Sequence, residues 1–544
     1  MNASEYDAVL IGGGHNGLIA ACYLARAGWR VLVCDRRVRP GGAVNTEELF
    51  PGFRLDTCST FHLLIHLTPV LRELDLADFG LRYMRHDPFA FAPFPGGRSM
   101  VFWKDLDATC RSIATWSERD AEAYRSFIRK WWHFNKAVFE TFLAPPTPGN
   151  LAGKIARSTI RDMRAGRSDP SMAGLELLRK TITSYGRLLD ETFETPELKA
   201  ALAWLAAQSG PPPPEIGTGD LLGSLAIYHK VGLTRPVGGS GRLAEALVAC
   251  LLAAGGEFRG GDGVVRVLLR GGRAVGVEME SGERFSAPVV ISNAHVQTTM
   301  LDLLPPDALP PEMRPKLAAL RTGNGIGMTI RCAAAALPDY GAYLRDGSGA
   351  PLPPGTQVHA GMQLICPSVA YLEQAHAEAA EGRPAARPAL VVMTPSALDP
   401  TLAPPGKHVL YIWAQYHPYE LAEGGAAAWD RIREREADRL LATLGEYAPN
   451  FPDAVHERQI YIQTPLDLER NVGMVHGNIM HLDMSLDQMF TFRPLPELSE
   501  YRTPVPGLYL TGAGTHPGGG VCGASGRNAA HTVLADLRRE SRRR

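Results

Sequence analysis

Residues 6–17 read YDAVLIGGGHNG and decide the fold of this 544-residue chain. A short apolar strand is predicted to run into a glycine-rich loop in which Gly12, Gly14 and Gly17 follow the pattern G-x-G-x-x-G. Apolar residues at helical spacing follow the loop and end at Gly28. A strand, a glycine loop and a helix in this order predict a Rossmann-type α/β unit.

Each glycine of the loop meets a different steric requirement of a dinucleotide site. Gly12 permits the tight turn, Gly14 lets the backbone approach a pyrophosphate, and Gly17 allows the helix to pack closely on the strand. The pyrophosphate would lie at the helix N-terminus, where free N–H groups favour an anion, so His15 and Asn16 also belong to the predicted site. Asp35 ends the next strand at the spacing expected for a residue that binds the ribose hydroxyls. The sequence therefore predicts a dinucleotide site.

A second glycine pair follows closely behind this acid. Arg36 and Arg37 lead into Gly41, Gly42 and Ala43. This arrangement resembles the flavoproteins of the amine oxidase and phytoene desaturase superfamily, whereas NAD dehydrogenases usually lack it. The resemblance implies that the dinucleotide is FAD and that these residues, Arg36 and the Gly41–Ala43 segment in particular, bind it.

The C-terminal region predicts a second anion-binding turn. Residues 507–514 form a buried strand that ends in glycines, and residues 515–530 continue as a glycine-rich turn into a helix. In the flavoenzymes that the chain resembles, this segment meets the ribityl chain and the flavin ring. The resemblance implies contacts from Gly512, Gly514, Gly520, Val521 and Gly523.

The middle of the chain predicts the rest of the same domain. A turn at 236–241 precedes a helix, a β-meander and an apolar strand that ends at Asn293 and Ala294. By resemblance, Val265 would meet the adenine through its backbone, and Asn293 and Ala294 would close the strand near the dinucleotide.

Longer motifs narrow the resemblance to one branch. The segments 395–408, 477–490 and 515–520, together with Arg493-Pro494, resemble the pyridine nucleotide-disulfide oxidoreductase domain-containing protein 2 branch, which is close to the carotenoid ketolases. The resemblance covers nearly the whole chain. It implies an α/β fold with a Rossmann-type, amine-oxidase-like FAD-binding domain and a mixed α+β substrate or cap domain. We expect the FAD-binding domain at 1–70, 235–295 and 500–544, and the cap at 71–234 and 296–499.

Composition excludes several other classes of protein. Lys and Arg number 56 against 57 Asp and Glu, a balance that argues against a nucleic-acid partner. The eight cysteines are scattered without a C-x-x-C pair, which argues against a disulfide reductase and favours a reducing, cytoplasmic location. No signal peptide and no apolar run of membrane-spanning length is predicted, and peripheral contact with a membrane is left open.

The sequence indicates neither a metal site nor a second dinucleotide site. His62 and His66 have a spacing compatible with metal binding on a helix, but no third ligand is nearby. No second strand-loop-helix with the G-x-G-x-x-G pattern is available for NAD(P)H. Electrons would therefore enter from the substrate and leave to oxygen, a quinone or another acceptor.

Three residues are candidates for catalysis. His516 stands just before the C-terminal glycines, a segment that lies against the flavin in resembling proteins, while His229 precedes the 236–241 turn and Tyr416 follows an apolar strand. A structural role remains the alternative for each. An aromatic helical face at 127–142 has three interpretations: core packing within the cap, an apolar substrate tunnel, or a membrane-docking face.

The resulting hypothesis is an FAD-dependent oxidoreductase that abstracts hydride from a small, apolar and polyene-like organic substrate to flavin N5, in a desaturation or dehydrogenation. Three alternatives remain. They are a carotenoid-ketolase-like oxygenation, a flavin amine oxidase, and a non-catalytic flavin-bound interaction protein.

Overall fold

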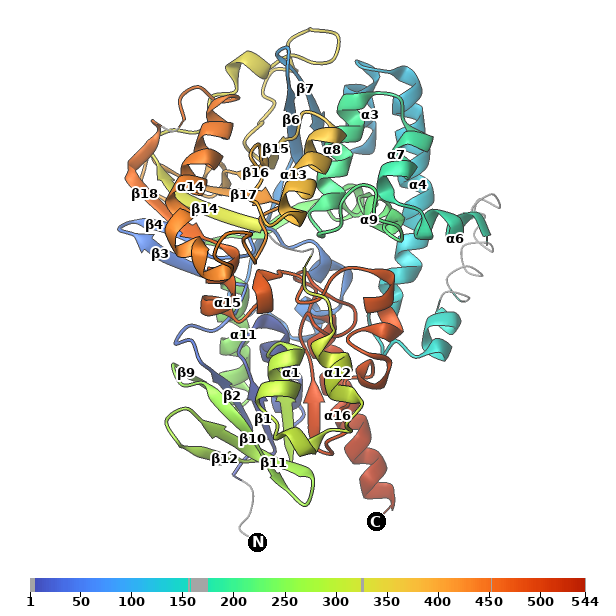
Figure 1. Cartoon of the computed structure of the whole chain (residues 1–544), viewed down its shortest axis with the longest axis vertical. Coiled ribbons are helices and arrows are strands. Elements are labelled where there is room, and N and C mark those ends of the chain that lie inside the picture. The colour runs from blue at the N-terminus through green and yellow to red at the C-terminus, as the bar shows by residue number, and fades with distance from the viewer. Residues whose placement is uncertain (1–4, 155–156, 158–174, 324–326, 452, 544) are drawn as a thin grey trace.

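The lower half of the molecule is built on a five-stranded parallel sheet (Figure 1). The computed structural model describes residues 5–154, 157, 175–323, 327–451 and 453–543. The strands lie in the order β19-β13-β1-β2-β9. Their bounds are Ala8–Ile11 (β1), Val31–Asp35 (β2), Glu257–Gly260 (β9), Val289–Ser292 (β13) and Leu508–Leu510 (β19).

Alternate side chains of these strands enter two different cores. Ala8 and Leu10 pack with helices on one face, whereas Val9 and Ile11 pack on the other face. The first face is covered by α1 (His15–Arg26), α11 (Arg242–Ala253) and α16 (Ala524–Arg543). The second is covered by the antiparallel meander β10 (Val264–Arg270), β11 (Arg273–Met279) and β12 (Arg284–Ser286). The Rossmann-type α/β prediction is confirmed.

The upper half contains a seven-stranded mixed sheet in the order β18-β14-β17-β16-β15-β6-β7 (Figure 1). All its neighbours are antiparallel except β15 and β6. The bounds are Ala90–Phe94 (β6), Arg98–Phe102 (β7), Gly327–Ala334 (β14), Met362–Ile365 (β15), Ala389–Met393 (β16), His408–Gln415 (β17) and Val455–Gln463 (β18).

Helices cover both faces of this sheet. One core holds side chains of α3 (Leu106–Ala114), α4 (Glu118–Thr141), α7 (Tyr185–Thr192), α8 (Pro196–Ala207) and α13 (Val369–Ala380), and the other holds those of α14 (Trp429–Gly445). Phe127 and Trp131 of α4 are buried in the first core. Core packing therefore accounts for these two members of the aromatic face. Among the described residues, no helix combines the length and apolarity that crossing a bilayer requires.

The remaining elements are short. They are β3 (Thr46–Phe50), β4 (Phe53–Asp56), η1 (Leu64–Leu67), α2 (Val70–Glu73), β5 (Tyr83–His86), α6 (Leu175–Ile182), α9 (Gly219–Gly223), α10 (Ala226–Lys230), β8 (Leu233–Pro236), α12 (Met313–Ala318) and α15 (Pro465–Val472). Every strand of the parallel sheet and the meander falls in a segment predicted for the FAD-binding domain, and every strand of the large sheet falls in the predicted cap. The domain boundaries themselves stay a prediction.

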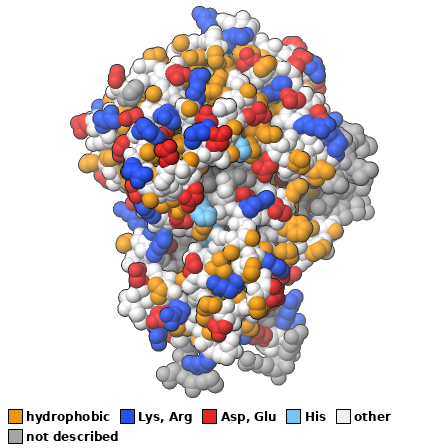
Figure 2. All heavy atoms as spheres, in the orientation of Figure 1, with side chains coloured by type: hydrophobic (Ala, Val, Ile, Leu, Met, Phe, Trp, Pro, Cys, Tyr) orange, Lys and Arg blue, Asp and Glu red, His pale blue; other side chains and the backbone are white. Residues whose placement is uncertain are grey.

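Charged side chains of both signs are interspersed over the face shown in Figure 2. This distribution agrees with the formal net charge of −1. Exposed charges at this spacing are solvated and contribute little to stability individually.

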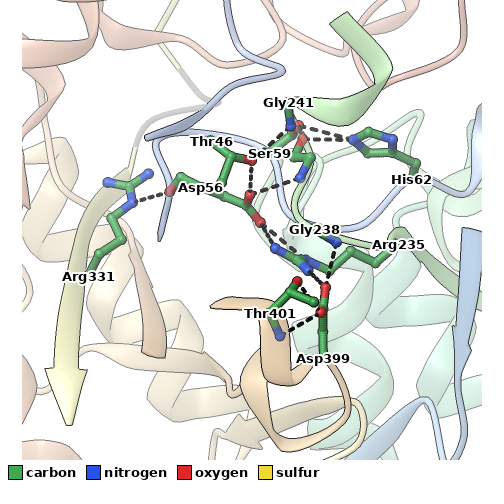
Figure 3. A network of polar contacts seen from close by, with 11 residues as sticks. Thr46, Asp56, Ser59, His62, Arg235, Gly238, Gly241, Arg331, Asp399 and Thr401 are labelled. Atoms are coloured by element: carbon green, nitrogen blue, oxygen red, sulfur yellow. Dashed lines mark hydrogen bonds and ion pairs between the residues drawn. The ribbon is translucent and has the colours of Figure 1, made fainter. Parts of the chain in front are cut away.

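A buried ion-pair network links residues of β4, β8, β14 and the turn at Asp399 (Figure 3). Arg235 of β8 places Nη2 2.8 Å from Asp56 Oδ2 and Nη1 3.3 Å from Asp399 Oδ2, and all three side chains are at most 2% exposed. Asp56 Oδ1 also accepts from the Ser240 N–H at 2.9 Å. From β14, Arg331 Nε donates to the backbone oxygen of Asp56 at 3.0 Å. The network thus joins the two-stranded pairings β3-β4 and β5-β8 to the seven-stranded sheet.

Removing Arg235 should destabilise the protein strongly. Arg235→Met leaves two buried carboxylates without their cation, so we expect the free energy of unfolding to fall by about 3–5 kcal/mol, measured by urea denaturation. The matched control is Arg458→Met, which removes an exposed pair with Asp438 and should cost less than about 1 kcal/mol. Equal effects of the two substitutions would contradict this prediction.

Candidate active site

A cavity of about 490 Å³ takes its walls from both halves of the molecule. One part is bounded by the loops that follow β1 and β2 and by the C-terminal glycine segment. The other part is bounded by strands of the seven-stranded sheet. We call the part bounded by the loops the glycine-lined region and the part bounded by the strands the apolar region.

The first region begins at the loop between β1 and α1. Gly14 precedes the helix without a side-chain cap, and no acidic residue lies in the first turn, so the N–H groups at this helix start are available to an anion. A Cβ on Gly14 would lie 2.7 Å from Asn293 Nδ2, in space that the cavity needs. A Cβ on Gly17 would lie 2.4 Å from the backbone oxygen of Gly12. Gly17 therefore serves close packing and does not itself line the cavity.

Asp35 is held in place beside this loop. Its Oδ2 accepts from the Gly13 N–H at 2.6 Å and its Oδ1 from the Arg37 N–H at 2.7 Å. Burial raises the pKa of Asp35, and these two hydrogen bonds act in the opposite direction. Arg36 also lines the cavity, and its guanidinium donates to the backbone oxygen of Arg470 at 3.1 Å, at the end of α15. The two backbone hydrogen bonds thus fix the position of the Asp35 carboxylate at the cavity wall.

The second glycine pair packs directly on the first loop. Gly41 N–H donates to the Gly13 oxygen at 2.8 Å, and a Cβ on Gly41 would lie 2.1 Å from the Val44 oxygen. Gly42 and Ala43 line the cavity, whereas Gly41 supports them from behind. A side chain at Gly41 would push this wall apart.

The remaining predicted cofactor residues divide into two groups. The first group lines the cavity and comprises Gly12, His15, Asn16, Asn293, Ala294, Gly520 and Val521. The second group does not line it and comprises Val265, Gly512, Gly514 and Gly523. Val265 is 47% exposed, and its neighbours Gly263 and Val264 form the wall instead. A Cβ on Gly523 would meet Ile19 at 2.7 Å, which indicates a packing role between α1 and α16.

None of the three catalytic candidates lines the cavity. His516 Nε2 donates to the Thr141 oxygen at 3.2 Å, and burial lowers its pKa to about 4. His229 bonds to the hydroxyl of Tyr124 at 2.8 Å, and burial lowers its pKa to about 4 as well. Tyr416 donates to the Pro211 oxygen at 3.2 Å. The geometry gives no support for direct contact between these residues and a substrate.

Three buried polar atoms in the cavity wall lack a hydrogen-bond partner. They belong to Thr60 (Oγ1), Gln208 (Nε2) and His481 (Nδ1). The motif at 477–490 included His481, but Thr60 and Gln208 carry no signal in the sequence. Unpaired buried polar groups are unfavourable unless a ligand satisfies them. Together with the glycine-lined wall, they fit a cofactor rich in donors and acceptors.

Histidines of this region are uncharged at neutral pH. Burial lowers the pKa of His15 and of His295 to about 4, and holds that of His481 well below its ordinary value. The His295 and His481 rings lie 5.4 Å apart. Polar but neutral side chains therefore line this part of the wall.

The second region of the cavity is apolar. Its side chains are Phe61, Leu63, Tyr228, Leu233, Met362, Val391, Met393, Tyr411 and Trp413. Among the described lining residues, Asp35 is the only carboxylate and Arg36 and Arg37 are the only guanidinium groups. All three lie at the end of β2 or directly after it, at the glycine-lined end. The apolar region thus offers no counter-charge to a charged ligand.

The expectation that His62 and His66 lie on one helix is wrong. The short helix η1 begins at Leu64, so His62 lies outside it and hydrogen-bonds to Ser240 Oγ at 2.8 Å. Within the described residues, no group of three His, Cys, Asp or Glu side chains has the arrangement of a metal site.

Residues 17–534 match the family described as flavin containing amine oxidoreductase. The chain belongs to this family. It is 37% identical to rat (Rattus norvegicus) pyridine nucleotide-disulfide oxidoreductase domain-containing protein 2, over 98% of this chain and 94% of the relative. It is also 31% identical to a limonene dehydrogenase chain of Castellaniella defragrans, over 98% and 95% of the two chains. The resemblance to the phytoene desaturase-like branch is therefore confirmed.

Solved structures agree on the fold. An oxidoreductase from Methanosarcina mazei superimposes with a TM-score of 0.60 at 19% identity, covering 97% of this chain and 99% of the other. The family and the fold together make the protein an FAD-dependent oxidoreductase. FAD supplies two-electron redox chemistry, and the residues that would hold it are those of the glycine-lined region.

Filling the space at Gly14 should abolish FAD binding. In Gly14→Val the side chain occupies the cradle beside Asn293, so we expect the flavin absorbance near 450 nm per mole of purified protein to disappear. Gly149→Val is the matched control, because a Cβ there meets nothing within 4 Å. A Gly14→Val variant that keeps its flavin colour and its midpoint of thermal unfolding would contradict the assignment of this loop to FAD binding.

His229 should contribute to the pH dependence of stability. Its pKa is lowered from 6.5 to about 4 in the folded protein, so the unfolded chain binds the proton more tightly. The stability that depends on neutral His229 is complete above pH 6.5 and is lost as the pH falls towards 4. In His229→Gln the free energy of unfolding should fall less steeply than in the native protein as the pH is lowered through this window. The two slopes should differ by up to about 1.4 kcal/mol per pH unit.

The measurement is a series of urea denaturation curves between pH 4.5 and 7.5. Because His229 does not line the cavity, the flavin spectrum of the variant at pH 7.5 serves as the control and should equal that of the native protein. Parallel pH profiles of the two proteins would contradict the lowered pKa.

Proposed function

We propose that this flavoenzyme removes hydride from an uncharged, apolar organic substrate, in a desaturation or dehydrogenation. The observation that carries the proposal is the apolar region of the cavity, in which aromatic and aliphatic side chains form the wall without any charged group among the described lining residues. An ionic substrate would lose its hydration there without compensation. A hydrocarbon-like substrate would gain from the same burial.

The chain's own residues would bind, orient and dehydrate the substrate. Tyr228, Tyr411 and Trp413 supply aromatic surface to the wall, and Val391 and Met393 supply aliphatic surface. Exclusion of water protects the reaction from side products. The bound FAD supplies the acceptor for hydride. The electrons would then pass to oxygen, a quinone or another acceptor.

The proposal is supported by the name of one relative. The limonene dehydrogenase chain, at 31% identity, is named for a substrate that is an uncharged unsaturated hydrocarbon. The tyrosine and tryptophan rings also favour a second candidate, the oxidation of a neutral amine against an aromatic wall, in a protein of the flavin-containing amine oxidoreductase family.

The test follows the flavin spectrum of the purified protein without oxygen while candidate substrates are added. We expect an apolar alkene such as limonene to bleach the absorbance near 450 nm, with a product two hydrogens poorer by mass spectrometry. Bleaching by amines alone would move the assignment to the second candidate. Oxygen incorporated into the product once air is admitted would favour a ketolase-like reaction, and a flavin that no compound reduces would favour a non-catalytic flavoprotein.

A further inference from the structure

Arg493 is a fully buried cation directly behind the cavity wall. Its Nε donates to the Ala513 oxygen at 3.0 Å, and its Nη2 donates to the same oxygen at 2.8 Å. Nη2 also donates to the Met480 oxygen at 2.6 Å. Because Ala513 and Met480 both line the cavity, the guanidinium is separated from the cavity by these wall residues alone.

The side chain keeps its charge in this position. Burial lowers the pKa of Arg493 to about 10, so the guanidinium stays protonated at neutral pH. The carboxylate of Asp483 attracts the guanidinium and opposes this lowering. Asp483 does not line the cavity, whereas the guanidinium contacts two residues that do. The positive member of this pair is therefore the one that lies against the wall.

The same guanidinium supports a residue with unusual backbone geometry. His481 lines the cavity and has a φ of +64°, in the left-handed region that residues with side chains rarely adopt. Arg493 Nη2 donates to the backbone oxygens on both sides of it, those of Met480 at 2.6 Å and Leu482 at 3.4 Å. Loss of Arg493 would therefore change the shape of the wall as well as its charge.

The strand order indicates which half of FAD lies near Arg493. Asp35 ends β2, the helix α1 follows β1, and Ala513 follows β19, in a sheet ordered β19-β13-β1-β2-β9. With the ribose at Asp35 and the pyrophosphate at the start of α1, the flavin half would continue on the side of β13 and β19. The lining guanidinium groups of Arg36 and Arg37 belong to the other end, at the ribose.

Reduction of the flavin creates a charge that this end of the cavity must accommodate. Hydride carries two electrons and one proton to the neutral oxidised ring, so the ring gains one negative charge. A buried charge is unfavourable unless fixed positive groups or dipoles compensate it. The wall histidines His295 and His481 do not supply that charge at neutral pH, because burial lowers the pKa of both. Arg493 is a protonated group whose contacts reach this end of the wall.

We propose that Arg493 stabilises the negative charge that the flavin gains on accepting hydride, and thereby raises the reduction potential of the bound FAD. Arg493 acts through the wall at Ala513 and Met480, so it is a positioning residue whose charge acts at a distance. A higher potential favours hydride transfer from substrates that give up hydride reluctantly. The inference rests on the assignment of the FAD site and does not depend on the identity of the substrate.

The test is the midpoint potential of the bound flavin, measured without substrate by slow reduction in equilibrium with a reference dye. Only flavin-loaded protein is compared, so a loss of FAD binding does not count as a change in potential. In Arg493→Gln we expect the equilibrium to shift at least about 10-fold towards oxidised flavin, which lowers the potential by about 30 mV. Arg493→Lys keeps the charge and should stay close to the native potential. Arg458→Gln is the matched control, because it removes an exposed guanidinium and should leave the potential unchanged.

A second variant has the opposite sign. Asp483→Asn removes the nearby negative charge at almost constant shape, and its side-chain oxygen can still accept from Asn478 Nδ2, as that of Asp483 does at 3.1 Å. The potential should therefore rise, whereas damage to the wall alone has no reason to raise it. This variant decides the matter if Arg493→Gln retains no flavin. A native potential in Arg493→Gln, an equal fall in Arg493→Lys, or no rise in Asp483→Asn would overturn the inference.

Discussion

The arrangement of the molecule depends on keeping four buried charges together. Arg235 is paired with Asp56 and Asp399, and Arg331 contributes a second cation that donates to the backbone of Asp56 (Figure 3). Arg235 is the cation that pairs with both carboxylates, and its loss in a low dielectric would leave two uncompensated charges. The four side chains come from β8, β4, β14 and the turn at Asp399, so the network holds the two-stranded β3-β4 and β5-β8 pairings against the seven-stranded sheet.

The network also reaches the cavity wall. The segment that follows Asp56 continues into residues 58–61 and Leu63, which line the cavity, and Arg331 donates to the backbone oxygen of Thr57 within it. The guanidinium of Arg331 lies 4.5 Å from the centre of the Tyr411 ring, another lining residue. One buried arginine thus touches the backbone on one side of the cavity and an aromatic wall on the other. A change in the network would therefore alter the shape of the site as well as the stability of the fold.

How much the sequence could predict depended on whether the information was local. The strand, glycine loop and helix around Gly14, and the acid at Asp35, are set by neighbouring residues, and the sequence located them correctly. The apolar wall was not predictable, because its residues lie on β15, β16 and β17, which are separated in the chain and join only in the sheet. His516 illustrates the other limit. Its segment was located by resemblance, but the direction of its side chain, towards Thr141 and away from the cavity, depends on tertiary packing.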